Sequence, residues 1–572
     1  MESKPQNEVR PIANLKDLIQ QSQNLFGNKN AFLLKSNDDN YYGVKYNEFK
    51  EDIDAFGTAL LNLGLKDKYI AVIGENRYEW CVTYLSVVCG VGIIVPLDKE
   101  LPYTELENLL IRSNANAIVF SGKYSREMRK LASTLPTVKY FINMDDLEGE
   151  QHFLSYRNLV QAGRQFINSG DRTYIEAEID NNKMSILLFT SGTTDLAKGV
   201  MLSHKNICSN VMAVSASLYI DSTDSVLSIL PIHHTYECTA GFLVMIYNGC
   251  TVSFNEGLKH IAKNLKEVRP TILMLVPLIL ESMHKKVWDQ VNKKLSTKIK
   301  LKLGIAVSDF LLKTLKIDIR KKLFKQIHDN IGGRIRLIIS GAAALDPNVS
   351  KGFDSLGIKV RQGYGLTEFS PIVTVNRDNF YKDDSIGLPL PGVEVKLVNM
   401  DSEGIGELIV KGDCVMLGYY ENTLATEKIL KDGWLYTGDI GYMDKYGFFY
   451  LTGRKKNVIV TKNGKNIFPE EVETYLNKSS FILESLVFGI YDEESGETFV
   501  EAQIVPDLEA IKLKLRVDDV PTDEINKIIS AEVKNINRFM PLYKRVRHFQ
   551  IREEEFAKTT TKKIKRYAQK TG

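Results

Sequence analysis

Residues 186–204, ILLFTSGTTDLAKGVMLSH, carry the strongest signal for fold and binding in the chain. The apolar run 186–189 predicts a buried strand, and a loop of Ser, Thr and Gly follows it at 190–194. Hydroxyls and backbone N–H groups on such a loop suit the phosphate oxygens of a nucleotide. The spacing does not match the GxxxxGK[ST] pattern of a Walker A loop, which argues against a P-loop ATPase. A polar surface turn is the alternative interpretation.

The composition is that of an ordinary globular protein. At 572 residues the chain is too long for one hydrophobic core, so we expect two or more domains. The net charge of +3 gives no general attraction to nucleic acid, and no nucleic-acid partner is expected. The six cysteines form no CxxC pair and are interpreted as reduced thiols of a cytoplasmic protein. The first residues, MESKPQNEVRPIANL, lack the apolar core of a secretion signal.

Short apolar runs alternate with helical patterns in the N-terminal part. Residues 15–65 are interpreted as an amphipathic helical lead-in, and YIAVIG, GIIVPL and AIVFS at 69–74, 92–97 and 117–121 as strands. This alternation predicts βαβ units, a largely parallel sheet and an α/β fold. Residues 81–97 are uncharged but shorter than the ~20 residues of a spanning helix. We therefore expect a buried helix there and no transmembrane segment.

Two segments that follow apolar runs offer groups for a ligand. LPIHHTYE at 230–237 comes at the end of a predicted strand, where α/β proteins collect ligands, and it contains His234. A histidine that only satisfies a loop hydrogen bond is the alternative there. RIRLIISGAAAL at 334–345 runs into a turn of small residues that would let a flat purine lie against the backbone: Gly341, Ala342 and Ala343. Tight packing between a strand and a helix is the alternative.

The segment RQGYGLTE at 361–368 supplies chemical groups that the small-residue turn lacks. Tyr364 offers a ring to stack on adenine, Thr367 a hydroxyl for phosphate, and Glu368 an oxygen ligand for Mg²⁺. Further along, Asp439 follows a glycine in YTGDIGYMD, and its carboxylate could accept hydrogen bonds from ribose hydroxyls. An Asp that only caps a turn is the alternative.

Residues 285–326 differ in character from the rest of the chain. They contain thirteen Lys or Arg residues and three Asp residues, with apolar residues interleaved at helical spacing. One interpretation is a solvated helical hairpin with a basic face. The other is peripheral contact with an anionic membrane, because a basic amphipathic helix binds a bilayer through charge and apolar burial together.

The C-terminal part predicts a small α+β domain that begins near residue 457. Asn463-Gly464 between VIVTK and KNIF is a strong hairpin signal. Pro469, followed by two glutamates, then opens a helix. The chain ends in a basic tail, AKTTTKKIKR at 557–566, which could be simply solvated.

Together these motifs resemble those of the adenylate-forming superfamily, which includes acyl-CoA synthetases, peptide-synthetase adenylation domains and firefly luciferase. The family's phosphate loop is roughly [FY]-T-S-G-[ST]-T-G-x-P-K-G; here Asp195 replaces the Gly and Ala197 the Pro. GYGxTE is kept at every fixed position. The tail resembles K-T-x-x-G-K-[IV], with Lys562 in place of the Gly. The resemblance spans nearly the whole chain and is strongest to bacterial long-chain fatty acid–CoA ligases.

The resemblance implies a two-domain architecture. An N-terminal AMP-binding domain at 1–455 would combine βα-wound sheets with a distorted barrel and carry the basic insertion at about 285–326. A small mobile α+β domain at 456–572 would follow, with its hinge at Lys456. Gly464 would lie on the face that meets coenzyme A.

The resemblance also implies roles for individual residues. The catalytic residues would be Lys563, Lys198, Glu368 and His234, and the last would line the acyl pocket and the approach of the thiol. Glu368 and Thr190 would hold Mg²⁺. The implied ATP- or AMP-binding residues are Thr190, Ser191, Gly192, Thr193, Thr194, Lys198, Gly341, Ala342, Ala343, Gly363, Tyr364, Gly365, Thr367, Asp439 and Arg454.

The implied activity has two steps. A long-chain fatty acid and ATP would give acyl-AMP and pyrophosphate, and coenzyme A would then displace AMP to give a thioester. An acyl carrier protein is the alternative acceptor. A relative that binds acyl or nucleotide ligands without turnover is a third interpretation, because Asp195 and Ala197 depart from the family pattern.

Overall fold

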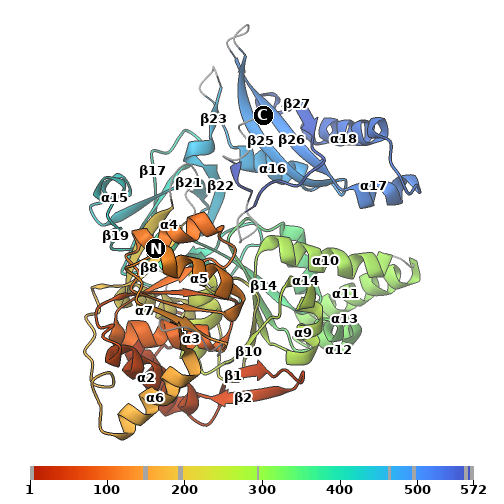
Figure 1. The fold of residues 1–572 in the computed structure, drawn as a ribbon. Coiled ribbons are helices and arrows are strands. Elements are labelled where there is room, and N and C mark those ends of the chain that lie inside the picture. The colour runs from red at the N-terminus through yellow and green to blue at the C-terminus, as the bar shows by residue number, and fades with distance from the viewer. Residues whose placement is uncertain are drawn as a thin grey trace. The chain divides into compact units, whose positions relative to one another are not determined.

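The computed structural model describes residues 5–145, 153–190, 197–292, 295–461, 465–492, 497–558 and 564–566. The chain divides into two compact units, both drawn in Figure 1. The first unit comprises Met1–Glu394 and Lys411–Leu435, and the second comprises Val395–Val410 and Tyr436–Gly572. The expected domain boundary between residues 455 and 456, with residues 456–572 moving as one body, stays a prediction.

The first unit contains an eight-stranded sheet in the order β19-β9-β8-β4-β3-β5-β6-β7. The strands from β8 through β7 are parallel, whereas β9 is antiparallel to both β8 and β19. The strands are β3 (Tyr69–Ile73), β4 (Ile93–Leu97), β5 (Ala117–Phe120), β6 (Tyr140–Asn143), β7 (Phe153–Ser155), β8 (Met184–Thr190), β9 (Lys198–Ser203) and β19 (Gly418–Tyr419).

A nine-stranded sheet in the same unit has the order β16-β15-β14-β13-β12-β10-β11-β1-β2. Its central strands, from β14 to β1, are parallel, and β15, β16 and β2 are antiparallel additions. The strands are β1 (Asn30–Lys35), β2 (Tyr41–Lys45), β10 (Ser225–Ser228), β11 (Thr251–Phe254), β12 (Ile272–Leu275), β13 (Leu337–Ser340), β14 (Lys359–Gly365), β15 (Ile372–Val375) and β16 (Leu388–Pro389).

Helices cover these sheets because their apolar residues face the strands. Leucines of α4 and α5 pack with the buried side chains of β3, β4 and β5 in one cluster, and α2 packs beside α6 (Figure 1). The helices are α1 (Leu15–Phe26), α2 (Tyr46–Asn62), α3 (Tyr78–Ser86), α4 (Tyr103–Arg112), α5 (Ser125–Thr134), α6 (Tyr156–Asn168), α7 (His204–Ser215), α8 (Val244–Tyr247), α9 (Ile261–Val268), α10 (Pro277–Asn292), α11 (Leu295–Leu315), α12 (Arg320–Leu323), α13 (Lys325–Asn330), α14 (Pro347–Ser355) and α15 (Thr423–Ile429).

The second unit contains two further groups of strands. The first is part of a sheet in the order β17-β18-β21-β20, with β22 paired to β21. The second is a sheet in the order β25-β26-β27, whose apolar face packs with α16 and α18 in one buried cluster. The elements are β17 (Glu394–Val398), β18 (Gly406–Lys411), β21 (Trp434–Met443), β22 (Phe449–Arg454), β23 (Ile459–Val460), β24 (Asn466–Ile467), α16 (Pro469–Leu476), β25 (Ile482–Asp492), β26 (Glu497–Pro506), α17 (Leu508–Leu515), α18 (Thr522–Asn537) and β27 (Val546–Ile551). Strand β20 (Leu430–Lys431) belongs to the first unit.

The predicted α/β class and the parallel core are confirmed, as is a buried helix before GIIVPL. The interpretation of residues 15–65 as a helical lead-in was partly wrong. Strands β1 and β2 separate α1 from α2, because β1 pairs with β11 and with β2. Among the described residues, no helix combines the length and the apolar composition needed to cross a bilayer.

Candidate active site

The predicted phosphate loop joins the two strands of a hairpin. Thr190 ends β8 directly opposite Lys198, the first residue of β9, and its hydroxyl donates to the Lys198 carbonyl across 3.4 Å. Arg112 donates to the carbonyl of Ala197 at 2.7 Å, which holds the far end of the loop. The hairpin thus fixes both ends of the loop. The predicted binding residues Ser191, Gly192, Thr193 and Thr194 lie outside the described residues.

Tyr419 brings together two of the predicted site residues of the first unit. It lies in β19, opposite Val200 of β9. Its hydroxyl donates to Oε1 of Glu368 at 2.8 Å, and the Lys198 ammonium nitrogen is 4.9 Å from the centroid of its ring. A cation suited to phosphate oxygens and a carboxylate suited to a hard metal ion therefore flank one phenol. Tyr419 was missed in the sequence, because only strand pairing between distant segments places it there.

The GYGLTE segment forms the end of β14 and the tight turn after it. An ideal Cβ built on Gly365 would lie 2.1 Å from the Pro371 carbonyl oxygen, so the turn requires glycine. Tyr364 is buried, and Gly363 lies opposite Val375 in the β14–β15 pair. Thr367 and Glu368 begin a short 3₁₀ turn and are half-buried. This turn presents the two polar side chains at the carboxyl end of a central strand.

The small-residue turn follows β13. A Cβ on Gly341 would lie 3.2 Å from the ring of Tyr236, whose hydroxyl donates to the Ile339 carbonyl at 2.9 Å. Gly341 therefore provides close packing for Tyr236. Ala342 has a positive φ of 74° and is half-buried, and Ala343 is exposed. A purine contact at these residues stays a prediction.

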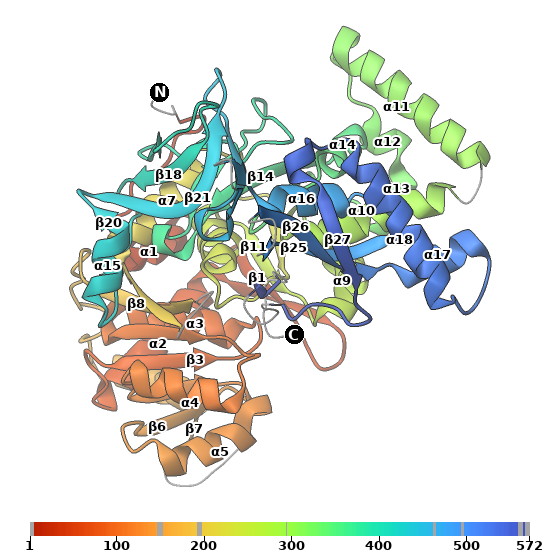
Figure 2. The same cartoon turned by 90° about the horizontal axis from the view of Figure 1, so that it is seen from above.

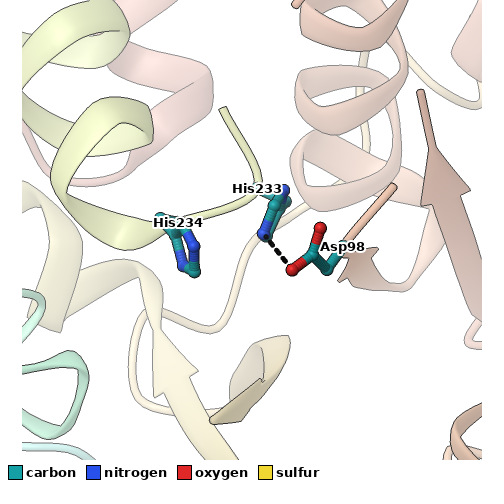
Figure 3. Close-up of side chains that lie close together, drawn as sticks. All are labelled: Asp98, His233 and His234. Atoms are coloured by element: carbon teal, nitrogen blue, oxygen red, sulfur yellow. Dashed lines mark ion pairs between the residues drawn. The ribbon is translucent and has the colours of Figure 1, made fainter. Parts of the chain in front are cut away.

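The segment LPIHHTYE follows β10 and is held by Asn76. The Asn76 side chain accepts from the backbone N–H of Ile232 at 3.1 Å and donates to the Leu230 carbonyl at 2.6 Å. His234 follows, half-buried, and its ring centroid is 4.2 Å from that of His233 (Figure 3). This loop lies at the carboxyl end of a strand, as expected from the sequence. The role of His234 toward acyl group or thiol stays a prediction.

The last residue of this segment, Glu237, carries a buried carboxyl group to which no role was assigned from the sequence. Glu237 is fully buried, and its Oε1 accepts a hydrogen bond of 2.6 Å from Ser228, which in turn accepts one from Asn76. Burial raises the pKa of Glu237 to about 8. At neutral pH the side chain is therefore mainly protonated, and it acts as part of the scaffold that holds the histidine loop.

In the second unit, Asp439 and Arg454 lie opposite each other in the β21–β22 pair. The Arg454 Nε is 2.7 Å from Oδ1 of the buried Asp439. Thr437 accepts a hydrogen bond from the Asp439 backbone N–H at 3.0 Å, which fixes the backbone of β21 around Gly438, whose φ is positive at 71°. The two predicted nucleotide contacts thus form one ion pair, and their roles toward a nucleotide stay predictions.

The predicted hinge residue Lys456 follows this pair in a short 3₁₀ turn. Burial lowers the pKa of Lys456, and the neighbouring charge of Arg454 lowers it further. The predicted hairpin is confirmed at its strands, since β23 pairs with β24 and Thr461 bonds to Lys465. Gly464, at its tip, lies outside the described residues. The helix predicted at Pro469 is α16.

The basic tail is anchored on both sides of residues 559–563. Lys558 and Ile564 form an antiparallel bridge, and Ile564 packs in a small cluster with Leu486, Val505 and Phe556. Arg566 donates to Glu473 at 2.6 Å and to the Val487 carbonyl at 3.0 Å. The predicted catalytic Lys563 lies outside the described residues, as does Lys562.

The chain is similar to known proteins over most of its length. The family model described as "AMP-binding enzyme" matches residues 19–420. Long-chain-fatty-acid–CoA ligase 1 of Cavia porcellus is 27% identical over 540 residues, which are 87% of this chain and 74% of that protein. Long-chain-fatty-acid–CoA ligase FadD15 of Mycobacterium bovis is 25% identical over 550 residues, which are 91% of this chain and 89% of that protein.

A solved structure with the same fold is that of the anthranilate CoA ligase AuaEII in complex with anthranoyl-AMP. It superposes with a TM-score of 0.76 at 20% identity and covers 98% of this chain and 97% of that one. At this identity the likeness concerns the fold alone.

Proposed function

The chain belongs to the AMP-binding enzyme family, and we propose that it is a long-chain fatty acid–CoA ligase. It joins a fatty acid to AMP and then transfers the acyl group to coenzyme A. The observation that carries the proposal is the placement of Lys198 and Glu368 on either side of Tyr419, inside the family match. The long-chain ligases that resemble the chain over most of its length support the choice of substrate.

In the first step a fatty acid carboxylate oxygen attacks the α-phosphorus of ATP, and pyrophosphate leaves. Both reactants are anionic and repel each other, so the site has to neutralise charge and hold the groups in line. Lys198 supplies a positive charge next to the hairpin loop. Glu368 and Thr190 offer a carboxylate and a hydroxyl oxygen, the donors that Mg²⁺ prefers. When bound, Mg²⁺ would neutralise phosphate charge; no protein nucleophile is needed.

In the second step the thiolate of coenzyme A attacks the acyl carbonyl, and AMP leaves with the phosphate oxygen that joined it to the acyl group. His234 lines the approach of the thiol. Lys563 serves the first step, and residues 456–572 rotate about Lys456 so that the hairpin with Gly464 serves the second.

Lys456→Pro should therefore slow thioester formation more than adenylation, because proline restricts the backbone rotation at the hinge. Lys456→Ala should keep the ratio of the two rates. A ratio that is unchanged in both variants contradicts the hinge.

Product analysis tests the proposed reaction. The full-length protein is incubated with ATP, Mg²⁺ and a panel of fatty acids, together with either coenzyme A or an acyl carrier protein. We expect acyl-CoA, AMP and pyrophosphate in equal amounts, with long-chain acids preferred. A thioester formed only on the carrier protein overturns the choice of acceptor. Ligand binding without release of pyrophosphate overturns the assignment as an enzyme.

We also propose that helix α11 contacts the surface of an anionic membrane. Helix α11 lies on the outside of the α10–α13 group (Figure 2). Four of its apolar side chains are about half exposed or more, and their spacing puts them on one face: Ile299, Leu303, Val307 and Phe310. Exposed Lys298, Lys300 and Lys302 lie along the same helix. Apolar groups with flanking positive charge suit the surface of an anionic bilayer, which also holds the fatty acid substrate.

Co-sedimentation of the protein with lipid vesicles tests the proposed membrane contact of α11. We expect binding to vesicles that contain anionic lipid and much weaker binding to zwitterionic ones. Exchange of Lys298, Lys300 and Lys302 for Gln should reduce binding. The same exchange at three exposed lysines of the first unit, Lys66, Lys139 and Lys183, should not. Equal binding of both triple variants contradicts the membrane proposal.

A further inference from the structure

Asp98, His233 and His234 lie close together in the first unit (Figure 3). Asp98 follows the carboxyl end of β4 in the eight-stranded sheet, and the two histidines follow the carboxyl end of β10 in the nine-stranded sheet. A ligand atom from each of the three lies within 4.8 Å of those from the other two. The ends of two parallel sheets thus bring two imidazoles and one carboxylate to a single point.

His233 is the residue that distinguishes this cluster from ordinary packing. Its side chain is only 7% exposed, and its Nε2 makes no hydrogen bond within the part of the chain that the structure describes. That nitrogen lies 3.5 Å from Oδ2 of Asp98. Leaving a buried polar atom without a hydrogen bond is costly, so such an atom calls for a partner. The Asp98 oxygen is placed where a second ligand of the same ion would be.

The spacing fits a transition-metal ion. Two ligands of a tetrahedral Zn²⁺, each about 2.0–2.1 Å from the metal, lie about 3.3 Å from one another. The His233–Asp98 separation of 3.5 Å is close to that value. The His234 ligand atom lies within 4.8 Å of the other two, so its ring has to move closer when a metal binds. Two imidazoles and a carboxylate favour Zn²⁺, Co²⁺ or Ni²⁺ over Mg²⁺ or Ca²⁺, which prefer oxygen ligands.

The backbone around the cluster is held in place, as a binding site requires. Asn76 accepts from the Ile232 N–H, and the His234 carbonyl accepts from the Cys238 N–H at 2.9 Å. The Asp98 and His234 side chains are partly exposed, which gives an ion a route from solvent. Three protein ligands leave a fourth position open for water.

We propose that Asp98, His233 and His234 form a binding site for one Zn²⁺ ion, separate from the Mg²⁺ that the ligase reaction uses. The site shares His234 with the proposed approach of the thiol, but the evidence for it is the arrangement of three side chains, and metal binding is measured without turnover.

Metal titration of the full-length protein, stripped with a chelator, tests the site. Co²⁺ serves as the probe because its visible d–d absorption reports its ligands. We expect one bound Co²⁺, displaced by Zn²⁺ and unaffected by a large excess of Mg²⁺, and an increase in Tm when Zn²⁺ is added. H233Q and D98N each alter a direct metal ligand. Each should weaken Co²⁺ binding by more than 10–100-fold, which is the typical loss when a residue that only hydrogen-bonds to a metal ligand is removed. H260Q, a change at an exposed histidine outside the cluster, should bind as the wild type does.

Two results would overturn the site. One is the absence of a Co²⁺ spectrum and of a Zn²⁺-dependent Tm increase in the wild type. The other is unchanged affinity in a variant that folds, judged by its Tm without metal. Because H233Q and D98N alter different elements, misfolding of one leaves the other as the test. The readout is a metal spectrum, so a failed ligase assay and a failed metal site give different patterns.

Discussion

The hydroxyl of Tyr419 donates a hydrogen bond to Oε1 of Glu368 across 2.8 Å, while the ring of the same tyrosine lies next to the ammonium of Lys198. The phenol thus orients the proposed metal-binding carboxylate and keeps the proposed phosphate-binding cation beside it. Hydrogen bonds to charged groups contribute about 1.5–3 kcal/mol, so this bond is strong enough to fix the carboxylate.

Tyr419→Phe removes that hydrogen bond and keeps the ring beside Lys198. We expect the adenylation rate to fall by about 10–100-fold and the Mg²⁺ concentration at half-maximal rate to rise, because Glu368 loses its orientation. Acyl-AMP formation measured over a Mg²⁺ series checks this. Tyr420→Phe, a change at the next residue, should leave the Mg²⁺ dependence as it is. The same Mg²⁺ dependence in Tyr419→Phe and in the wild type would contradict a role of Tyr419 in holding Glu368.

The outline of the fold was predictable because it depends on local patterns. Alternating apolar runs and helical patterns indicated the parallel sheets, and Asn463-Gly464 indicated the pairing of β23 with β24. The lead-in at 15–65 was interpreted incorrectly, because the pairing of β1 with β11 depends on a segment far along the chain.

The contacts within the site were less predictable for the same reason. Tyr419 reaches Glu368 only because β19 pairs with β9, and Asp98 meets His233 only because two sheets end at one place. Single motifs identify residues that can do chemistry, but their partners come from strand order. Gly341 shows a further limit, since its small size could serve a purine or a packed ring, and the structure contains the ring of Tyr236 there.

Gly365→Ala should destabilise the turn that carries Glu368. Its Cβ would lie 2.1 Å from the Pro371 carbonyl oxygen, so the backbone has to move. We expect a loss of about 1–3 kcal/mol in the free energy of unfolding, measured by chemical denaturation, together with reduced adenylation. Gly74→Ala is the control, because its Cβ would make only an ordinary contact of 3.4 Å with Ser121. Equal stability of the two variants would contradict the steric argument.

Glu237 should make stability depend on pH. Burial raises its pKa from 4.5 to about 8, so between these values the folded protein keeps a proton that the unfolded chain loses. Its contribution is therefore fully present below pH 4.5 and is lost as pH rises toward 8, by up to about 1.4 kcal/mol per pH unit.

Glu237→Gln keeps an acceptor for Ser228 and cannot ionise. We expect the difference in unfolding free energy between this variant and the wild type to grow in favour of the variant as pH rises from about 5 to 8. Taking the difference cancels the titration of other groups. A difference that does not change with pH would show that Glu237 is ionised in the folded protein.

Lys563→Ala should separate the two half-reactions. We expect acyl-AMP formation to fall by at least about 100-fold, while acyl-AMP supplied from outside is still converted to the thioester, because the lysine acts only on ATP. Lys562→Ala is the matched control on the same tail. Equal loss of both half-reactions in Lys563→Ala would contradict its role, and loss of adenylation in Lys562→Ala alone would move the role to that lysine.

Exchange of labelled pyrophosphate into ATP, without coenzyme A, measures the proposed adenylation step by itself. The reverse of the first step requires an acyl-adenylate, so a long-chain fatty acid and Mg²⁺ should together start the exchange, and omission of either should stop it. Absence of exchange with every fatty acid in the panel, with Mg²⁺ and a folded protein present, would contradict activation through an acyl-adenylate.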